Sequence, residues 1–465
     1  MTDGSPDTPR TAPDGGTTVE PPSDGLLDSK GARDALLVLG LMAGLYVLFA
    51  LISMGQGNDF NGLVNTLQRI TFLSAVYAML VLALNLHWGY TGLFNIGIAG
   101  FMMVGVYTFG IITGSPEATG TTGAPGLGLP IWAGFIGGAL MAGFFGFLAA
   151  LPALRLDADY LAIVTIGFSE MIRLTINSTT LQTLEIGGIE IGTGGASGII
   201  FPGPDLLVRG LLFANPATNS NPTALGDFWF GIGTAAGIED SVMLGWAYAI
   251  FLVLVVGLFY AILIRTGNSP FGRVLKAIRE DEIVANSLGK DTNRFKIVAF
   301  VVGCALMGIG GILWRGAGGS TTPTSFLPIA TFYIFIALII GGSGSNTGSV
   351  IGGAVFASLL FQGPPAIAGL VDNALQGVID ATPTTFVDAL AIGPGGFVVY
   401  MLDNISSLRF VLLGVVLILV MIYRPDGLLG HRKETAASVD LSVRPDGEGG
   451  TGGGRPAADG GETDE

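Results

Sequence analysis

Ten apolar runs, separated by more polar stretches, constrain the fold of this chain more than any other feature. A transmembrane helix needs about 20 consecutive, mostly apolar residues. The runs that reach or approach this length are residues 35–54, 70–86, 92–113, 131–153, 160–173, 243–264, 297–314, 329–342, 349–361 and 410–423. The sequence therefore predicts an all-α fold, a polytopic helical integral membrane protein with about ten transmembrane segments.

The composition agrees with a membrane protein. Half of the residues are hydrophobic and 12% are charged, whereas about 25% of the residues of a typical soluble protein are charged. Several runs are shorter than a full span and are interrupted by some of the 74 glycines. Because short or broken helices are tolerated in a membrane only where protein covers their backbone, these runs predict a translocation path lined by such helices.

Charge predicts the orientation of the chain. Residues 265–296, between two apolar runs, carry seven of the 21 basic residues, although the net charge is −14. Positive charge between spans marks a cytoplasmic loop, because Lys and Arg resist translocation across the bilayer. With ten spans, both termini are then cytoplasmic. Residues 1–33 and 431–465 are rich in Pro, Gly, Asp and Glu, so we expect two disordered acidic tails around a membrane domain of residues 34–430.

The excess of acidic over basic residues also bears on the salt concentration in which the protein works. Acidic tails and outer loops, with only five lysines in the chain, are typical of a halophilic protein, whose surface carboxylates hold water and ions. Full stability of the purified protein without molar salt would contradict this hypothesis. The alternative is that the acidic tails only keep the protein soluble.

The basic loop also has the pattern of an amphipathic helix. Apolar residues recur at helical spacing, and charged residues occupy the other side. The apolar set is Phe271, Val274, Leu275, Ile278, Ala285 and Leu288, and the charged set is Arg273, Lys276, Arg279 and Glu280. Gly289 is expected to end this helix.

Several chemistries are disfavoured. The sequence contains no phosphate-binding G-x-x-x-x-G-K-[ST] loop, so the chain is not expected to hydrolyse ATP by P-loop chemistry. One cysteine and two isolated histidines predict neither a metal site nor a cofactor. A membrane-embedded enzyme would need clustered His, Asp or Glu in the apolar runs. A stand-alone secondary transporter or channel is the alternative from another class, but it would need charges near mid-membrane, which these runs almost lack.

Four ordered passages carry the most specific signal in the sequence. Residues 82–108 carry Asn85, Gly89, Tyr90, Gly92, Gly97 and Phe101, and residues 154–174 carry Arg155, Asp159, Tyr160, Thr165, Gly167, Glu170 and Arg173. Residues 272–289 belong to the basic amphipathic loop, and residues 339–359 are rich in glycine. In this order the passages resemble the early pattern, the second block, the cytoplasmic coupling loop and the glycine-rich late spans of the LivM-type permease subunit of branched-chain amino acid ATP-binding-cassette (ABC) importers. The resemblance covers about residues 82–430.

This resemblance implies a transport subunit that is not itself an enzyme and that forms half of a path for branched-chain amino acids. The implied partners are a second homologous permease subunit, two ABC ATPases, an extracellular substrate-binding protein and membrane lipid, with no nucleic acid. Leu93 and Ile98 stand where the family often has Gln and His. They leave urea or a short-chain amide as the alternative substrate.

For an importer permease, the amphipathic loop is the expected contact with the ATPase. Its apolar side would anchor in a groove of that subunit, and its charges would set the register. The candidate residues are Arg279, Glu280, Asp281, Ala285, Leu288 and Gly289. The alternative is a helix lying on lipid headgroups, which Glu280, Asp281 and Glu282 oppose because they repel anionic lipid.

Six polar residues are candidates for the translocation path: Asn85, Asn95, Thr165, Glu170, Arg173 and Thr193. Glu170 and Arg173 stand three residues apart, so they either pair with each other or meet the charged groups of a zwitterionic substrate. The two asparagines and Thr165 either line the path or form hydrogen bonds between helices. Thr193 lies in a T-G-G stretch of an outer loop and either contacts substrate or shapes that loop.

Overall fold

The computed structural model describes residues 30–118, 124–153, 158–375, 383–403, 414–415, 417–424 and 427–429. Most of each predicted tail, residues 1–29 and 430–465, lies outside the described residues, as does Arg155 of the second sequence block. The first helix begins at Lys30. Residues 30–33, which the sequence assigned to the tail, thus belong to the first turn of this helix.

Seven helical segments in the described part of the chain are long and apolar enough to cross a membrane. They comprise α1 (Lys30–Gly55), α2 (Phe60–Leu84), α4 (Ile131–Ala153), α8 (Asp240–Asn268), α11 (Thr292–Arg315), α12 (Pro328–Gly341) and α13 (Asn346–Ala357) with its extensions. The helices α3 (Ile98–Thr113) and α5 (Ala158–Ile176) complete the bundle. The polytopic helical class is confirmed, and the number ten stays a prediction because the last run, 410–423, is only partly described.

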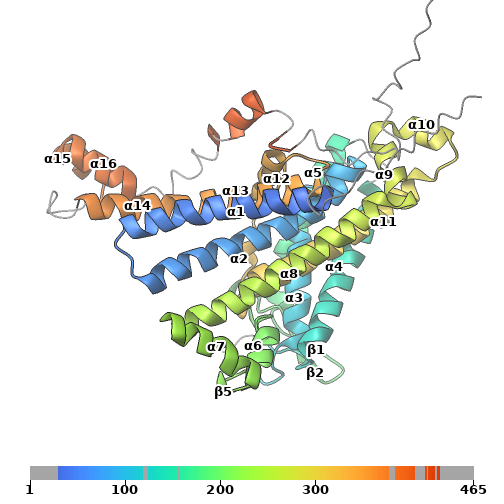
Figure 1. Cartoon of the computed structure of the whole chain (residues 1–465). Helices are drawn as coiled ribbons and strands as arrows, with labels where there is room; N and C mark the ends of the chain where they lie inside the picture. The colour runs from blue at the N-terminus through green and yellow to red at the C-terminus, as the bar shows by residue number, and fades with distance from the viewer. Residues whose placement is uncertain are drawn as a thin grey trace, which may run out of the picture.

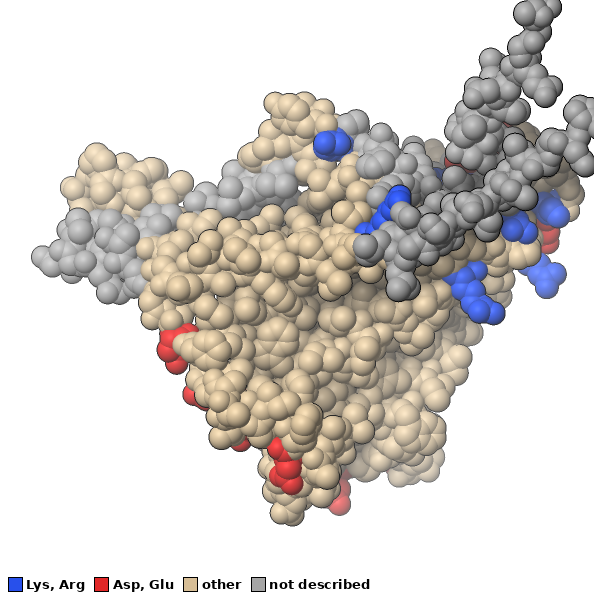
Figure 2. All heavy atoms as spheres, viewed as in Figure 1, with Lys and Arg blue, Asp and Glu red and all other residues tan. Residues whose placement is uncertain are grey.

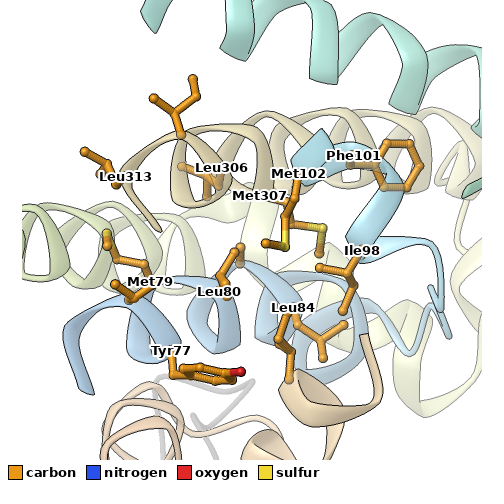
Figure 3. Close-up of a cluster of buried hydrophobic side chains, with 14 of the residues drawn as sticks. Tyr77, Met79, Leu80, Leu84, Ile98, Phe101, Met102, Leu306, Met307 and Leu313 are labelled. Carbon is orange, nitrogen blue, oxygen red and sulfur yellow. The ribbon is translucent and has the colours of Figure 1, made fainter. Parts of the chain in front are cut away.

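Helix α2 lies between α1 and α8 in the view of Figure 1. Within residues 60–90, which comprise α2 and the turn that follows it, 89% of the apolar 18-residue segment is buried. The corresponding segment of α1 is 11% buried. Figure 3 shows Met79, Leu80 and Leu84 of α2 facing residues of α3 and α11 in one hydrophobic cluster. Glycine brings α3 and α11 together: a Cβ atom at Gly105 would lie 2.6 Å from the Cα atom of Gly308. Small residues at such crossings let helix backbones pack closely in membranes.

The connection between α2 and α3 departs from the predicted span 92–113. After α2 the chain forms one wide π-helical turn, η1 (Asn85–Tyr90), and residues 92–97 are not helical. The φ angle of Gly92 is 73°, which favours glycine and helps to end the helix. Side chains satisfy the released backbone, since Ile96 N–H donates to Thr165 Oγ1 (2.9 Å) and Gly97 N–H to Asn95 Oδ1 (2.8 Å). A broken helix inside a bilayer requires such partners.

One end of the bundle is formed by the chain between α5 and α8 together with residues 320–326, which follow α11. It contains the helices α6 (Leu206–Leu212) and α7 (Ala224–Ala236), the short 3₁₀ turns η3 (Thr179–Leu181), η4 (Gly195–Ser197) and η5 (Pro323–Phe326), and small strand pairs. The antiparallel pairs are β1 (Leu184–Ile186) with β2 (Ile189–Ile191), β3 (Ile199–Ile200) with β6 (Ser320–Thr321), and β4 (Phe213–Asn215) with β5 (Ser220–Pro222). These short strands are the exception to the all-α prediction.

The opposite end carries α9 (Pro270–Glu280) and α10 (Glu282–Ser287). Most of the Lys and Arg side chains in view gather there, whereas most Asp and Glu side chains lie toward the α6–α7 end (Figure 2). Beyond α13, a second π-helical turn, η6 (Ser358–Gln362), leads into α14 (Gly363–Leu375). The helices α15 (Phe386–Ile392) and α16 (Pro394–Asp403) follow.

Candidate functional site

The α9–α10 end is the first candidate site, and α9 starts with strong local signals. Ser269 caps the helix by accepting the N–H of Gly272 (3.2 Å), and Pro270 occupies the first turn. Gly272 is required where α8 turns into α9, because a Cβ atom there would lie 2.2 Å from the carbonyl oxygen of Thr266. Leu275 and Ile278 are buried against the bundle.

The predicted single helix is two helices, because Asp281 ends α9 and caps α10. The backbone of Asp281 is extended, with φ −159° and ψ 108°. Its carboxylate accepts the N–H groups of Ile283 (2.8 Å) and Val284 (3.0 Å). A short carboxylate side chain competes well with helical hydrogen bonds at such a position. The break rotates α10 relative to α9, so the two helices expose different faces.

Helix α10 is held against α11 by one ion pair. Lys296 Nζ lies 2.7 Å from Glu282 Oε1, which also accepts the hydroxyl of Thr292 (3.0 Å). Ala285 is buried beneath the helix. Gly289 follows the last turn with φ 76°, as the sequence predicted for the residue that ends this helix.

Three large apolar side chains project outward from α10. Ile283 is 78% exposed, Val284 53% and Leu288 73%. The exposed residues Glu280 and Asp281 lie beside them. Sequence reasoning named Leu288 but missed Ile283 and Val284, because it continued the α9 periodicity through Asp281. The signal that identifies them is the Asp–Glu pair at 281–282, which is typical of a new helix N-terminus.

The inner face of α9 contacts the π-helical turn η1 through two basic side chains. Arg279 Nη1 donates to the backbone oxygen of Gly89. Lys276, which is 6% exposed, places its ammonium 5.5 Å from the ring centroid of Tyr90. A cationic side chain makes each contact, and both contacts end on η1. Arg279, predicted as an ATPase contact, is thus turned partly toward its own chain.

Asn85 lies in a fully buried polar network at the same turn. Its Nδ2 donates to Asn346 Oδ1 (3.0 Å), and its Oδ1 accepts the N–H of Gly344 (2.8 Å). Asn346 Nδ2 in turn donates to the Tyr90 hydroxyl (2.7 Å). Asn85 and Asn346 are 0% and 1% exposed. Asn346, from the first turn of α13, was not identified from the sequence.

Asn95 and Thr165 belong to a neighbouring network around the broken link 92–97. Asn95 Nδ2 lies 3.1 Å from His87 Nδ1, and the other ring nitrogen of His87 lies 3.1 Å from the Phe300 carbonyl oxygen. The His87 ring also stacks on the Phe300 ring, with centroids 4.8 Å apart. Both Asn95 and Thr165 are fully buried, and their role in lining a path stays a prediction.

Glu170 and Arg173 pair within α5. Arg173 Nε lies 2.9 Å from Glu170 Oε2, and a second bond makes the contact bidentate. Their side chains are 35% and 15% exposed. Thr193 lies beyond the end of α5, where its hydroxyl donates to the carbonyl oxygens of Ile176 (2.9 Å) and Leu181 (3.0 Å). It also borders a cavity of about 380 Å³ between α3, α4 and α5 whose lining is mostly apolar.

Residues 66–421 match the model of a family described as the branched-chain amino acid transport system permease component. The chain is 31% identical over 361 residues to the high-affinity branched-chain amino acid transport system permease protein LivM of Escherichia coli, covering 77% of this chain and 69% of that protein. It is 25% identical to the probable branched-chain amino acid transport permease protein LivM of Methanocaldococcus jannaschii, covering 79% and 94%.

A second group of relatives has a different name. The high-affinity branched-chain amino acid transport system permease protein LivH of Salmonella typhimurium is 24% identical over 288 residues, which is 61% of this chain and 80% of that protein. No solved structure matches the chain.

Proposed function

The chain belongs to the family of branched-chain amino acid transport permease components, and from this premise we propose that it forms half of the translocation path of an ABC importer for branched-chain amino acids. The observation that carries the proposal is the 31% identity to a LivM protein over 77% of the chain. Urea or a short-chain amide is the less supported substrate, because these relatives are named for branched-chain amino acids.

The proposed partners are a second homologous permease subunit, two ABC ATPases and an extracellular substrate-binding protein. The likeness to LivH, a second permease of the same kind of transport system, supports a related permease partner. The ATPases would supply the hydrolysis for which this chain has no phosphate-binding loop.

The α9–α10 end is the proposed docking site for an ATPase. Ile283, Val284 and Leu288 form an exposed apolar face on a short helix, which fits insertion into a groove. The adjacent Glu280 and Asp281 favour a protein partner over anionic lipid. In this proposal Ala285 seats α10 and Gly289 ends it, whereas Arg279 joins the docking helix to α2.

Charge supports the proposed orientation. Basic residues such as Arg265 and Arg279 lie in the last turns of α8 and α9, and acidic residues such as Asp227 and Asp240 lie in the first turns of α7 and α8 at the opposite end. The positive-inside rule then makes the α9–α10 end cytoplasmic. Both termini, with acidic tails 1–33 and 431–465, would lie on that side.

Glu170 and Arg173 are the proposed path residues best suited to meet a zwitterion, since both retain exposed surface. We propose that Asn85, Asn95 and Thr165 contribute by holding the broken backbone beside the path, and that Thr193 shapes the outer mouth. A halophilic habitat also stays a proposal, supported by the net charge of −14.

Reconstitution tests the function. The chain, the second permease, both ATPases and a leucine-loaded binding protein are placed in liposomes, and uptake of labelled leucine and urea is measured. We expect leucine uptake that requires ATP and all subunits. Uptake by this chain alone would overturn the ABC proposal, and uptake of urea without leucine would overturn the substrate.

Copurification tests the docking site. Replacing Ile283, Val284 and Leu288 with Ser removes apolar side chains whose full burial contributes about 1.5–3 kcal/mol each. We expect ATPase binding to weaken on the order of 100-fold or more. The matched control replaces three exposed apolar residues of the α6–α7 end, Ile186, Ile189 and Leu211, with Ser. Equal ATPase recovery with both triple variants would contradict the proposal.

A further inference from the structure

The contacts of η1 connect the docking end to a part of the bundle that lies far away in the sequence. On one side, α9 holds η1 through Arg279 and Lys276, as described above. On the other side, η1 contacts the turn between α12 and α13 through Asn85 and Tyr90. The same π-helical turn is therefore the meeting point of two separate groups of helices.

Asn346 makes the second connection rigid, because its side-chain amide both donates and accepts a hydrogen bond. Its Nδ2 donates to Tyr90 (2.7 Å) while its Oδ1 accepts from Asn85 (3.0 Å). Asn85 completes the chain by accepting the Gly344 N–H (2.8 Å). Each of these groups is buried, so breaking one bond would leave an unsatisfied polar atom in a low-dielectric interior. The network therefore has one strongly preferred arrangement.

Because the backbones of α12 and α13 pack closely, a displacement of Asn346 would move both helices. A Cβ atom at Gly341, the last residue of α12, would lie 2.0 Å from the carbonyl oxygen of Gly348 in α13. The segment after α16 adds two bonds to the same place, from Leu428 N–H to Ile340 O (2.8 Å) and from Leu429 N–H to Gly341 O (3.1 Å). Helices in such contact move together, since packed interiors do not deform continuously.

We propose that Asn346, acting through Asn85 and Tyr90, is a positioning residue that transmits movement of α9 to the α12–α13 pair during transport. Asn346 touches neither ATPase nor substrate in this proposal. The inference rests on the proposed function, because it requires that an ATPase moves α9. It adds an internal linkage that is separate from the docking face.

The test measures how much leucine enters per ATP hydrolysed by the complete reconstituted complex. Asn346→Ala removes both bonds of the linkage, and Tyr90→Phe removes the hydroxyl that accepts from Asn346 and also donates to the Leu263 carbonyl oxygen (3.4 Å). We expect complexes that assemble and hydrolyse ATP, with transport per ATP lowered about tenfold by Asn346→Ala, as expected for one or two lost buried hydrogen bonds. The Tyr90→Phe variant should show a smaller decrease and keeps the test available if Asn346→Ala does not fold.

Ser74→Ala is the matched control. It also removes a buried bond between α2 and the α13 region, from Ser74 Oγ to Ser358 Oγ (3.2 Å), but at a distance from α9 along both helices. We expect its transport per ATP to equal that of the unmodified chain. An equal decrease in the Ser74→Ala and Asn346→Ala variants would mean a merely structural role and would overturn the inference.

Two further outcomes separate the inference from the function on which it rests. An unchanged amount of leucine transported per ATP in both the Asn346→Ala and Tyr90→Phe variants would overturn the linkage while leaving ATPase docking intact. Failure of the unmodified chain to recruit any ATPase would instead overturn the proposed function, and the linkage with it.

Discussion

Charged side chains on α9 and on α5 are satisfied in opposite ways. On α9, Arg279 and Lys276 contact residues of η1, which belongs to a different part of the chain. On α5, Glu170 and Arg173 contact each other within one helix. Contacts between elements fix the position of a helix relative to its neighbours, whereas a pair within one helix only reduces the cost of placing charge in a membrane.

The apolar surroundings of the two helices follow the same division. Leu275 and Ile278 of α9 are buried against the bundle, while Ile163 and Met171 of α5 are 65% and 61% exposed in the isolated chain. Helix α9 is thus fixed to its own subunit and α5 presents an open face. The following predictions test this difference, beginning with the largest expected effect.

Gly89→Ala should be the most damaging single change. A Cβ atom there would lie 1.9 Å from Asn85 Oδ1 and 2.8 Å from the Gly344 nitrogen, so η1 and the α12–α13 turn would be forced apart. We expect a loss of about 3–5 kcal/mol in stability, or no folded protein. The control, Gly167→Ala on α5, places its Cβ atom in open space. Thermal unfolding in detergent measures both, and similar melting temperatures would contradict the difference.

Arg279→Ala should have the next largest effect. The substitution leaves the Gly89 carbonyl without its charged donor, which costs about 1.5–3 kcal/mol. Arg279→Lys keeps the charge without the planar donor group and should recover part of the loss. Measured unfolding free energies that are unchanged by Arg279→Ala would mean that the bond from Arg279 to Gly89 does not help to hold α9.

The ion pair between Lys296 and Glu282 should contribute less. Glu282 is 41% exposed at the side chain, so solvent screens much of the attraction. A double-mutant cycle with Lys296→Met and Glu282→Gln should give a coupling energy of about 1 kcal/mol. The value should fall with added salt, and a coupling that does not depend on salt would show that the pair is effectively dry.

The Glu170–Arg173 pair should contribute least to stability. Removing it with Glu170→Gln should change the unfolding free energy by about 0.5 kcal/mol or less, as for other pairs within one helix. If the pair contacts substrate, leucine uptake should fall far more than stability does. A loss of leucine uptake that is explained by the loss of folded protein would instead assign the pair a structural role.

The sequence predicted the long helices well, and α4 coincides with the predicted residues 131–153. It failed where a local polar contact interrupts an apolar run. Residues 92–97 are as apolar as a helix, but Thr165 and Asn95 satisfy their backbone in another conformation. In the same way, the Asp281 cap divided one predicted helix into two. Hydropathy measures the composition of a segment and contains no information about these hydrogen bonds.

The candidate site was predicted only in part for a related reason. Residues of one segment, such as Ala285, Leu288 and Gly289, were found from periodicity and resemblance. Asn346 was missed because its partner Asn85 lies 261 residues away, in another part of the sequence. Its own surroundings, a glycine-rich run, predict close helix packing and give no sign of a polar contact.

That separation also affects how the protein is made. Asn85 and His87 leave the ribosome long before Asn346 and Phe300, which lie 261 and 213 residues later. At about 5–20 residues per second, synthesis of the intervening chain lasts on the order of 10–50 s. During that time, η1 has an asparagine and a histidine without their final partners beside a hydrocarbon interior. The buried turn that follows α2 is therefore among the last parts of the bundle to complete its contacts, and early release of α2 into lipid would compromise assembly.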